Sequence, residues 1–135
     1  MQNGKVVHFE DDKGFRAMIK KSLKTFSRER HGVVGEAADL AGSIAVLDQI
    51  KSGELDANVV LLDGNLSLGV TSGEDARIIA DYIKQNEVPV RVVGLGAQAM
   101  SEAGVKVDID VAKNGCLEDP RALSKAIDRL EEIEK

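Results

Sequence analysis

The run Asn-Val-Val-Leu-Leu-Asp at residues 58–63 decides the fold of this chain. Four aliphatic residues stand in a row, and Asp63 ends the run. A strand with one face in water alternates apolar and polar residues, whereas a strand covered on both faces is apolar throughout. Residues 90–95 form a second, nearly continuous aliphatic run. The two runs predict central strands of a parallel sheet that carries helices on both faces.

Short strand patterns alternate with longer helical patterns along the rest of the chain. Strands are predicted at residues 5–9, 32–37, 58–62, 90–95 and 107–111. Apolar residues three or four apart predict helices over 12–27 and 40–50, a third from a Thr71 and Glu74 capping box to residue 86, and a last one after an Asp119 cap. These units predict a doubly wound α/β sandwich with right-handed crossovers.

The composition is that of a globular protein with one domain. The chain has 135 residues, and 43% of them are apolar, which is enough for a hydrophobic core. Cys116 is the one cysteine, so an internal disulfide framework is excluded. No apolar run reaches the ~18 residues of a membrane span, and the first residues are unlike a signal peptide. We therefore expect a cytoplasmic protein without a membrane partner.

Charge and aromatic content bear on nucleic-acid binding. The formal net charge is −5, and we recognise no block of like charge along the chain. The chain has no Trp, one Tyr and three Phe, which leaves little for stacking on bases. Nucleic-acid binding usually needs a basic patch, so we expect no nucleic-acid partner.

Charged residues follow three of the predicted strands at the point where each strand ends. Glu10, Asp11 and Asp12 follow the first strand, Asp63 ends the third, and Lys113 ends the fifth. Ligands of such sheets bind at the carboxyl ends of the strands, and we expect these side chains to gather there. Clustered carboxylates favour a hard cation such as Mg²⁺, which binds oxygens at ~2.0–2.1 Å. A lysine beside them can pair with a phosphoryl oxygen.

In these features the chain resembles the receiver domain of bacterial two-component response regulators. The resemblance covers almost the whole chain and rests on the acids after the first strand, on Arg16, on Asp63 after Val-Val-Leu-Leu, and on Lys113 after the fifth strand. It implies a flavodoxin-like (βα)5 three-layer sandwich with a five-stranded parallel sheet in the order 2-1-3-4-5. It also implies a single receiver-like domain over residues 1–135, without an output domain.

The resemblance implies a function and a set of site residues. Glu10 and Asp11 correspond to an acidic pair that binds Mg²⁺ together with Asp63 and the backbone carbonyl of Asn65. Asp63 corresponds to the phosphoacceptor, and Lys113 to the lysine that contacts it and then its phosphate. The implied protein is a stand-alone receiver, not an enzyme, that takes a phosphoryl group from a histidine kinase or phosphotransfer protein and signals by contact with another protein. The sequence names neither these partners nor the oligomeric state.

Three positions and one segment length depart from the receiver pattern. Gly96 stands where the family has Thr or Ser, Asp110 where it often has an aromatic residue, and Asn114 where a proline normally follows the lysine. The stretch between Gly96 and Lys113 is several residues short, so the fourth helix is expected to span about two turns or less. The usual readout of phosphorylation is therefore missing. A second interpretation is a pseudo-receiver that binds a partner without phosphorylation.

Simpler interpretations exist for several of these residues. Asp11 or Asp12 could cap the helix that follows, Asp63 could form a turn, and Lys113 could be solvated. Residues 94–99 match the dinucleotide fingerprint G-x-G-x-x-A, but on the fourth strand instead of the first, which makes nucleotide binding a minor third hypothesis. Among the remaining candidates, we expect His8 to be a satisfied core or edge histidine, and His31 to be solvated in a polar connector.

Overall fold

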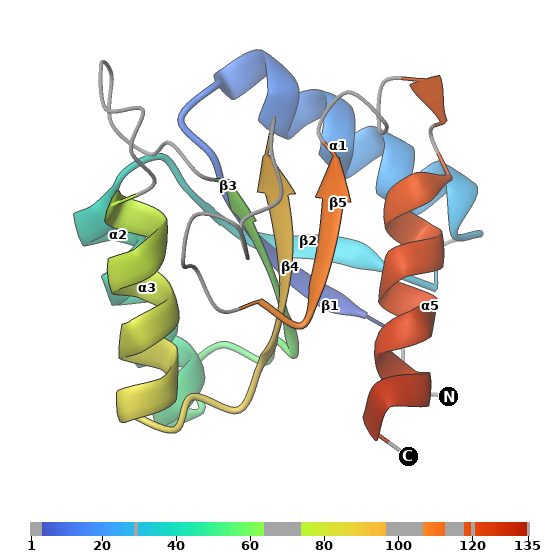
Figure 1. Ribbon diagram of the computed structural model, residues 1–135. Helices are drawn as coiled ribbons and strands as arrows, with labels where there is room; N and C mark the ends of the chain where they lie inside the picture. The colour runs from blue at the N-terminus through green and yellow to red at the C-terminus, as the bar shows by residue number, and fades with distance from the viewer. Residues whose placement is uncertain are drawn as a thin grey trace.

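The structure is a parallel sheet between two layers of helices (Figure 1). This computed structural model describes residues 4–28, 30–63, 74–96, 107–112, 118–119 and 121–134. The strands are β1 (Lys5–Phe9), β2 (Gly32–Ala37), β3 (Val59–Asp63), β4 (Arg91–Gly96) and β5 (Ile109–Ala112). The helices are α1 (Lys13–Phe26), α2 (Leu40–Ser52), α3 (Glu74–Gln85) and α5 (Ala122–Glu134).

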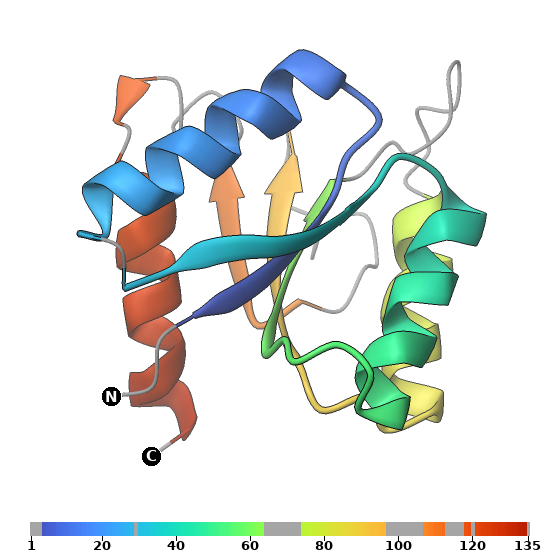
Figure 2. The same ribbon diagram turned by 180° about the vertical axis from the view of Figure 1, so that it is seen from behind.

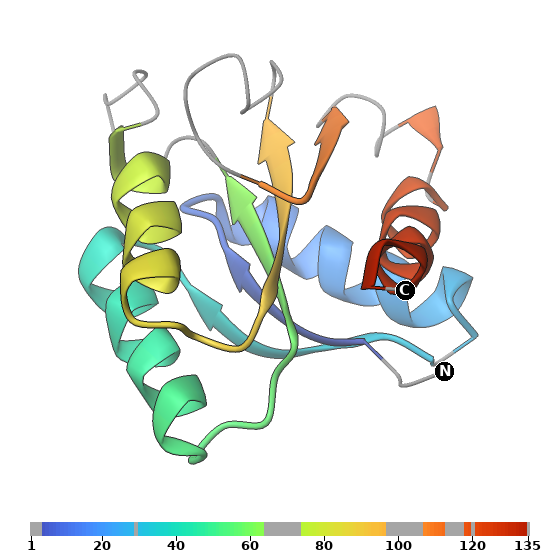
Figure 3. The same ribbon diagram turned by 60° about the horizontal axis from the view of Figure 1, so that its bottom comes forward.

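The strands are parallel and lie in the order β2-β1-β3-β4-β5. The predicted flavodoxin-like architecture and its strand order are thus confirmed. In the register, Phe9 of β1 pairs with Leu62 of β3, and Asp63 pairs with Leu95 of β4. The arrowheads of β3, β4 and β5 point to one edge of the sheet, and β1 leads into α1 at the same edge (Figures 1 and 3).

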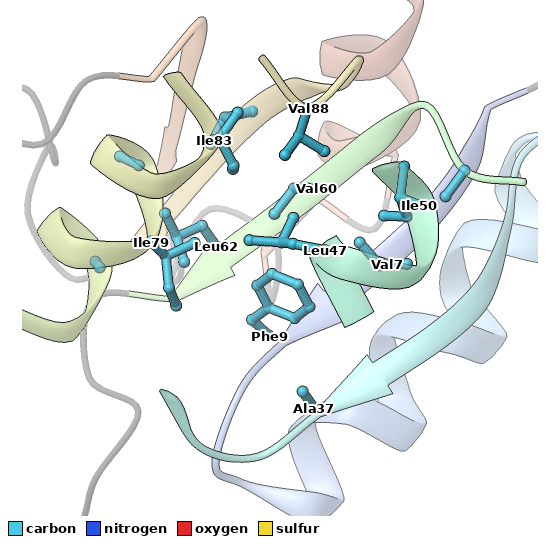
Figure 4. Packing of buried hydrophobic residues seen from close by; sticks show 14 residues of the cluster. Val7, Phe9, Ala37, Leu47, Ile50, Val60, Leu62, Ile79, Ile83 and Val88 are labelled. Atoms are coloured by element: carbon cyan, nitrogen blue, oxygen red, sulfur yellow. The ribbon is translucent and has the colours of Figure 1, made fainter. Parts of the chain in front are cut away.

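Two hydrophobic clusters, one on each face of the sheet, hold the layers together. The face toward α2 and α3 (Figure 4) buries Val7, Phe9, Ala37, Leu47, Ile50, Ala57, Val60, Leu62, Ala76, Ile79, Ala80, Ile83, Val88 and Val92. Helices α1 and α5, blue and red in Figure 2, lie on the other side of the sheet. That face buries Val6, Ile19, Leu23, Val59, Leu61, Val93, Leu95, Leu123, Ile127 and Leu130. The central strands are therefore covered on both sides, as their unbroken apolar runs predict.

Side-chain caps fix the N-terminal starts of the first two helices. The Asp12 carboxylate accepts from the backbone N–H of Phe15 at 3.0 Å and begins α1. The Asp39 carboxylate likewise accepts from the backbone N–H of Gly42 at 2.7 Å and begins α2. Gly53 caps the C-terminal end of α2, and its φ of +87° is a left-handed conformation that glycine adopts without strain. The cap interpretation is confirmed for Asp12.

The predicted and observed elements differ most near β5. The strand was predicted from residue 107 but begins at Ile109. Asp108 instead bonds to Val92 of β4 through both its backbone and its side chain. Its backbone N–H donates to the carbonyl of Val92 at 2.9 Å, and its carboxylate accepts from the N–H of Val92 at 2.7 Å. The predicted fourth helix and Thr71 lie outside the described residues. None of the described helices combines the length and the apolar character needed to cross a membrane.

Candidate functional site

Three carboxylates lie together at the carboxyl edge of the sheet. Glu10 follows β1, Asp11 comes next, and Asp63 is the last residue of β3. One oxygen from each of these side chains lies within 4.8 Å of the other two. Glu10 and Asp63 are 0% and 4% exposed, and Asp11 is half-buried. The structure thus brings together three of the residues that the sequence singled out.

The pairing of β1 with β3 explains why these acids meet. Phe9 of β1 pairs with Leu62 of β3. Glu10 and Asp63 are the next residues along the sequence, so they reach the same level of the sheet. Leu61 packs in the cluster against α1 and α5, and the alternation of side chains along a strand places Asp63 on that same face. The acids stand at the ends of β1 and β3, two neighbouring interior strands of the sheet that are almost entirely buried.

The backbone at Glu10 is held from both sides. Its N–H donates to the carbonyl of Ala37 at 3.0 Å, which ties it to the end of β2. Its carbonyl accepts from the Arg16 guanidinium at 2.5 Å, and Arg16 Nε also lies 3.7 Å from a carboxylate oxygen of Glu36 on β2. Arg16 therefore joins α1, β2 and the acid-bearing turn. The sequence singled out Arg16 only through the family resemblance, because Glu36 lies 20 residues away along the chain.

The carboxylate set suits a hard divalent cation. Oxygens that share one Mg²⁺ at ~2.0–2.1 Å lie about 3–4 Å apart, so the set needs only small side-chain rotations or a bridging water. Carboxylates that are buried side by side repel one another, and a bound cation relieves that repulsion. Glu10, Asp11 and Asp63 are the described residues that would hold such an ion.

Two predicted site residues, Asn65 and Lys113, lie outside the described residues. Two of the departures from the receiver pattern are described. Gly96, the last residue of β4, is buried and pairs with Ala112. Asp110 is exposed on β5 and pairs with Gly94. The described end of β4 thus has no hydroxyl at Gly96, and the described part of β5 has a carboxylate in place of an aromatic ring.

The two histidines are both buried, which confirms one prediction and overturns the other. His8 is 0% exposed in β1 and meets the ring of Phe15 edge-on, with 6.1 Å between ring centroids. The expectation of a solvated His31 is wrong, because this side chain is 1% exposed. Its Nδ1 accepts from the backbone N–H of Gly4 at 2.8 Å, so Nε2 carries the proton and donates to Asp128 on α5 at 2.8 Å. Partners 27 and 97 residues away create this environment, and no local pattern signals them.

Asp128 is the centre of this second polar cluster. Arg30 binds its two carboxylate oxygens at 2.8 and 3.1 Å, and His31 binds one of them. Burial acts to raise the pKa of Asp128, but the hydrogen bonds from Arg30 and His31 outweigh burial and lower the pKa below its ordinary value. The cluster fastens α5 to the start of β2, at the end of the strand remote from the acids, and so has a structural role.

Solved structures share the fold of this chain, whereas no family model and no curated protein sequence matches it. The signal receiver domain of the response regulator NarL from Mycobacterium tuberculosis has a TM-score of 0.73 and 23% identity, over 98% of each chain. A chain from the complex of the P1 domain of CheA3 with CheY6 from R. sphaeroides has a TM-score of 0.68 and 19% identity, over 98% of this chain and 99% of that one. The Mn²⁺-bound response regulator Rcp1 has a TM-score of 0.65 and 22% identity, over 92% and 91%.

This chain has the fold of a response regulator receiver domain. The resemblance inferred from the sequence is therefore confirmed. On the receiver fold, the acidic cluster occupies the carboxyl ends of β1 and β3, beside the point where the strand order reverses. Open parallel α/β sheets bind their ligands at that crevice. The receiver-like fold and the carboxylate geometry thus point to the same edge of the molecule.

Proposed function

We propose that this chain is a response regulator receiver that accepts a phosphoryl group on Asp63 from a histidine kinase in a Mg²⁺-dependent reaction. One observation carries the proposal: the carboxylates of Glu10, Asp11 and Asp63 lie within 4.8 Å of one another at the carboxyl edge of a receiver fold. Two structural neighbours support its parts. Rcp1 was solved with Mn²⁺, and CheY6 with the P1 domain of CheA3.

In the proposed reaction, Asp63 is the nucleophile. One of its carboxylate oxygens attacks the phosphorus of a phosphohistidine, so that an O–P bond forms while the P–N bond breaks and the histidine nitrogen leaves with the bonding electrons. Glu10, Asp11 and Asp63 would hold the metal, and the Arg16 hydrogen bond fixes the Glu10 backbone. When bound, Mg²⁺ supplies positive charge to the phosphoryl oxygens. Transfer of this kind is accelerated mainly by positioning and charge neutralisation.

Two further residues enter the proposal from the family resemblance. Lys113 is proposed to pair with the phosphoryl oxygens, and the backbone carbonyl of Asn65 to complete the metal site. Phosphorylation would add negative charge at the sheet edge and alter contacts with a downstream protein. The single-domain organisation, the cytoplasmic location and the absence of a nucleic-acid partner stay predictions.

A second candidate function is a pseudo-receiver that binds a partner without phosphorylation. The described Gly96 and Asp110 favour it, because Gly96 lacks the hydroxyl group and Asp110 lacks the aromatic ring of the family pattern. The retained acid cluster favours the phosphoacceptor, since a surface used only for docking has no need of two buried carboxylates beside a third.

Intact-mass measurement tests the proposal directly. The protein is incubated with MgCl₂ and acetyl phosphate, alongside Asp63→Asn and the control Asp81→Asn, which removes an exposed carboxylate on α3. We expect a single phosphoryl adduct on the wild type and on Asp81→Asn, and none on Asp63→Asn. A wild type that neither gains an adduct nor binds Mg²⁺ would contradict the proposal and favour the pseudo-receiver.

A further inference from the structure

The exposed side of α1 carries positive charge along its whole length. Its exposed charged residues, together with one that follows the helix, are Lys13, Lys20, Lys21, Lys24 and Arg28, here called the basic α1 face. No acidic residue occurs within residues 13–28. Ile19 and Leu23 on the opposite side are buried against the sheet, so the basic α1 face is turned toward solvent. A helix of 14 residues extends this face over about 21 Å.

This charge contrasts with the rest of the chain. Residues 13–30 contain seven of the 18 Lys and Arg residues but one of the 23 Asp and Glu residues. The remaining residues therefore hold 11 basic and 22 acidic side chains, a net charge of −11. The expectation that the sequence holds no block of like charge is wrong for this segment, because the overall charge of −5 averages two opposite regions.

We propose that the basic α1 face is an electrostatic docking surface for a protein with a compact acidic patch. Five cations on one helix face attract such a patch and repel basic surfaces, which sets both association rate and partner choice. Phe26, 40% exposed at the end of α1, offers an apolar contact at the rim. The proposal rests on the charge pattern, and it does not need the acid cluster to react.

The charge pattern favours a protein over nucleic acid or an anionic membrane. A long polyanion or a lipid surface extends beyond one helix and meets the acidic remainder of the molecule, whose net charge of −11 opposes it. A compact acidic patch about the length of α1 meets only the cations. The acids Asp11 and Asp12 directly precede α1 and limit the basic α1 face on that side.

The position of the face has a consequence for signalling. Helix α1 begins one residue after Asp12, next to the metal-site residue Asp11. A protein bound along α1 therefore lies beside the turn that carries Asp11, whose carboxylate is part of the acid cluster. That this partner exchanges phosphoryl groups with Asp63, or reads its state, rests on the proposed function.

Binding of a short poly-L-glutamate peptide tests the proposal, with a DNA duplex and phosphatidylserine vesicles as parallel probes. The variant Lys20→Glu/Lys21→Glu alters the basic α1 face. The matched control Lys51→Glu/Arg129→Glu changes the net charge by the same four units at exposed positions on α2 and α5. Amide chemical shifts locate binding, and fluorescence anisotropy at about 50 and about 300 mM NaCl gives the affinity and its salt dependence.

We expect the peptide to change the amide chemical shifts of α1. It should bind the wild type and the control with equal affinity, and the α1 variant about tenfold more weakly. Equal loss in both variants, or shifts spread over other elements, would overturn the proposal. Tighter binding of DNA or vesicles to α1 would overturn the assignment to a protein. Labelling with acetyl phosphate is read separately: an adduct that is equal in both variants keeps the phosphoacceptor role, whatever the peptide shows.

Discussion

Asp128 on α5 accepts hydrogen bonds from Arg30 and His31, and its pKa is lowered by them below the ordinary value of 3.8. A carboxyl group with a depressed pKa stabilises the folded state fully above the unfolded pKa, and this contribution is lost as the pH falls through the folded pKa. We predict that Asp128→Asn lowers the free energy of unfolding by roughly 1 kcal/mol near neutral pH, since Asp128 is partly exposed. The difference from wild type should shrink as the pH is lowered below about 4.

Urea unfolding followed by circular dichroism at several pH values measures this effect. Asp81→Asn, at an exposed position of α3, is the control and should follow the wild type at every pH. A difference between wild type and Asp128→Asn that stays constant down to pH 3 would show that the carboxylate charge is not the source of the stabilisation.

Gly4 tests the same cluster from the backbone side. A Cβ atom at this position would lie 2.6 Å from His31 Nδ1 and 3.0 Å from a methyl group of Ile127. Since both neighbours are buried, we predict that Gly4→Ala lowers the free energy of unfolding by about 1–3 kcal/mol. At Gly32 an added Cβ meets nothing within 4 Å, so Gly32→Ala is the matched control. Equal denaturation midpoints for the two variants would contradict the prediction.

The residues differ in how far the sequence reveals their environment. Glu10, Asp11 and Asp63 could be singled out because each follows a recognisable apolar strand, and parallel strands bring such positions to one edge. His31 could not be placed, because its burial depends on Gly4 and on Asp128, almost 100 residues further along the chain. Local patterns indicate what a strand end carries, whereas tertiary contacts decide which polar side chains are buried.

At the scale of elements, Arg16 connects α1 to the two strands beside it. Its side chain is 17% exposed, donates to the carbonyl of Glu10 and lies near the carboxylate of Glu36. We predict that Arg16→Met, which keeps most of the side-chain length, lowers the free energy of unfolding by about 1–3 kcal/mol, because the Glu10 carbonyl loses its charged donor. The control Lys21→Met removes an exposed charge from the same helix and should change stability by less than about 0.5 kcal/mol. Similar losses in both variants would assign the effect to helix charge alone.

Most elements could be predicted to within a residue or two, and the exceptions have identifiable causes. β1 and β2 match their predicted limits, because apolar runs and the adjoining caps define them sharply. β5 starts two residues later than predicted. The N–H of Val92 donates to the side-chain carboxylate of Asp108 and not to a backbone carbonyl of the neighbouring strand. A polar residue that replaces a ladder hydrogen bond leaves the hydrophobic pattern unchanged, so the sequence alone could not show this shift.

At the scale of the whole molecule, the architecture follows from the buried central strands, but the distribution of charge does not follow from the total. The order β2-β1-β3-β4-β5 places the acids of β1 and β3 side by side, and it places α1 next to them. The acid cluster therefore lies beside the start of a basic helix. A composition that averages to −5 hides this contrast, which only the positions of the residues on α1 reveal.

The acid cluster leads to a prediction about the stability of the whole fold. A cation that binds the folded state alone raises the free energy of unfolding by RT ln(1 + [L]/Kd), about 1.4 kcal/mol at ten times Kd. We predict that MgCl₂ raises the melting temperature of the wild type and that excess EDTA reverses the rise. Asp11→Asn should weaken this response, because it removes one of three carboxylates. Asp39→Asn should retain it, since asparagine caps α2 as well as aspartate does and lies outside the cluster. An identical response to MgCl₂ in both variants would mean that Mg²⁺ acts on general charge and not at this site.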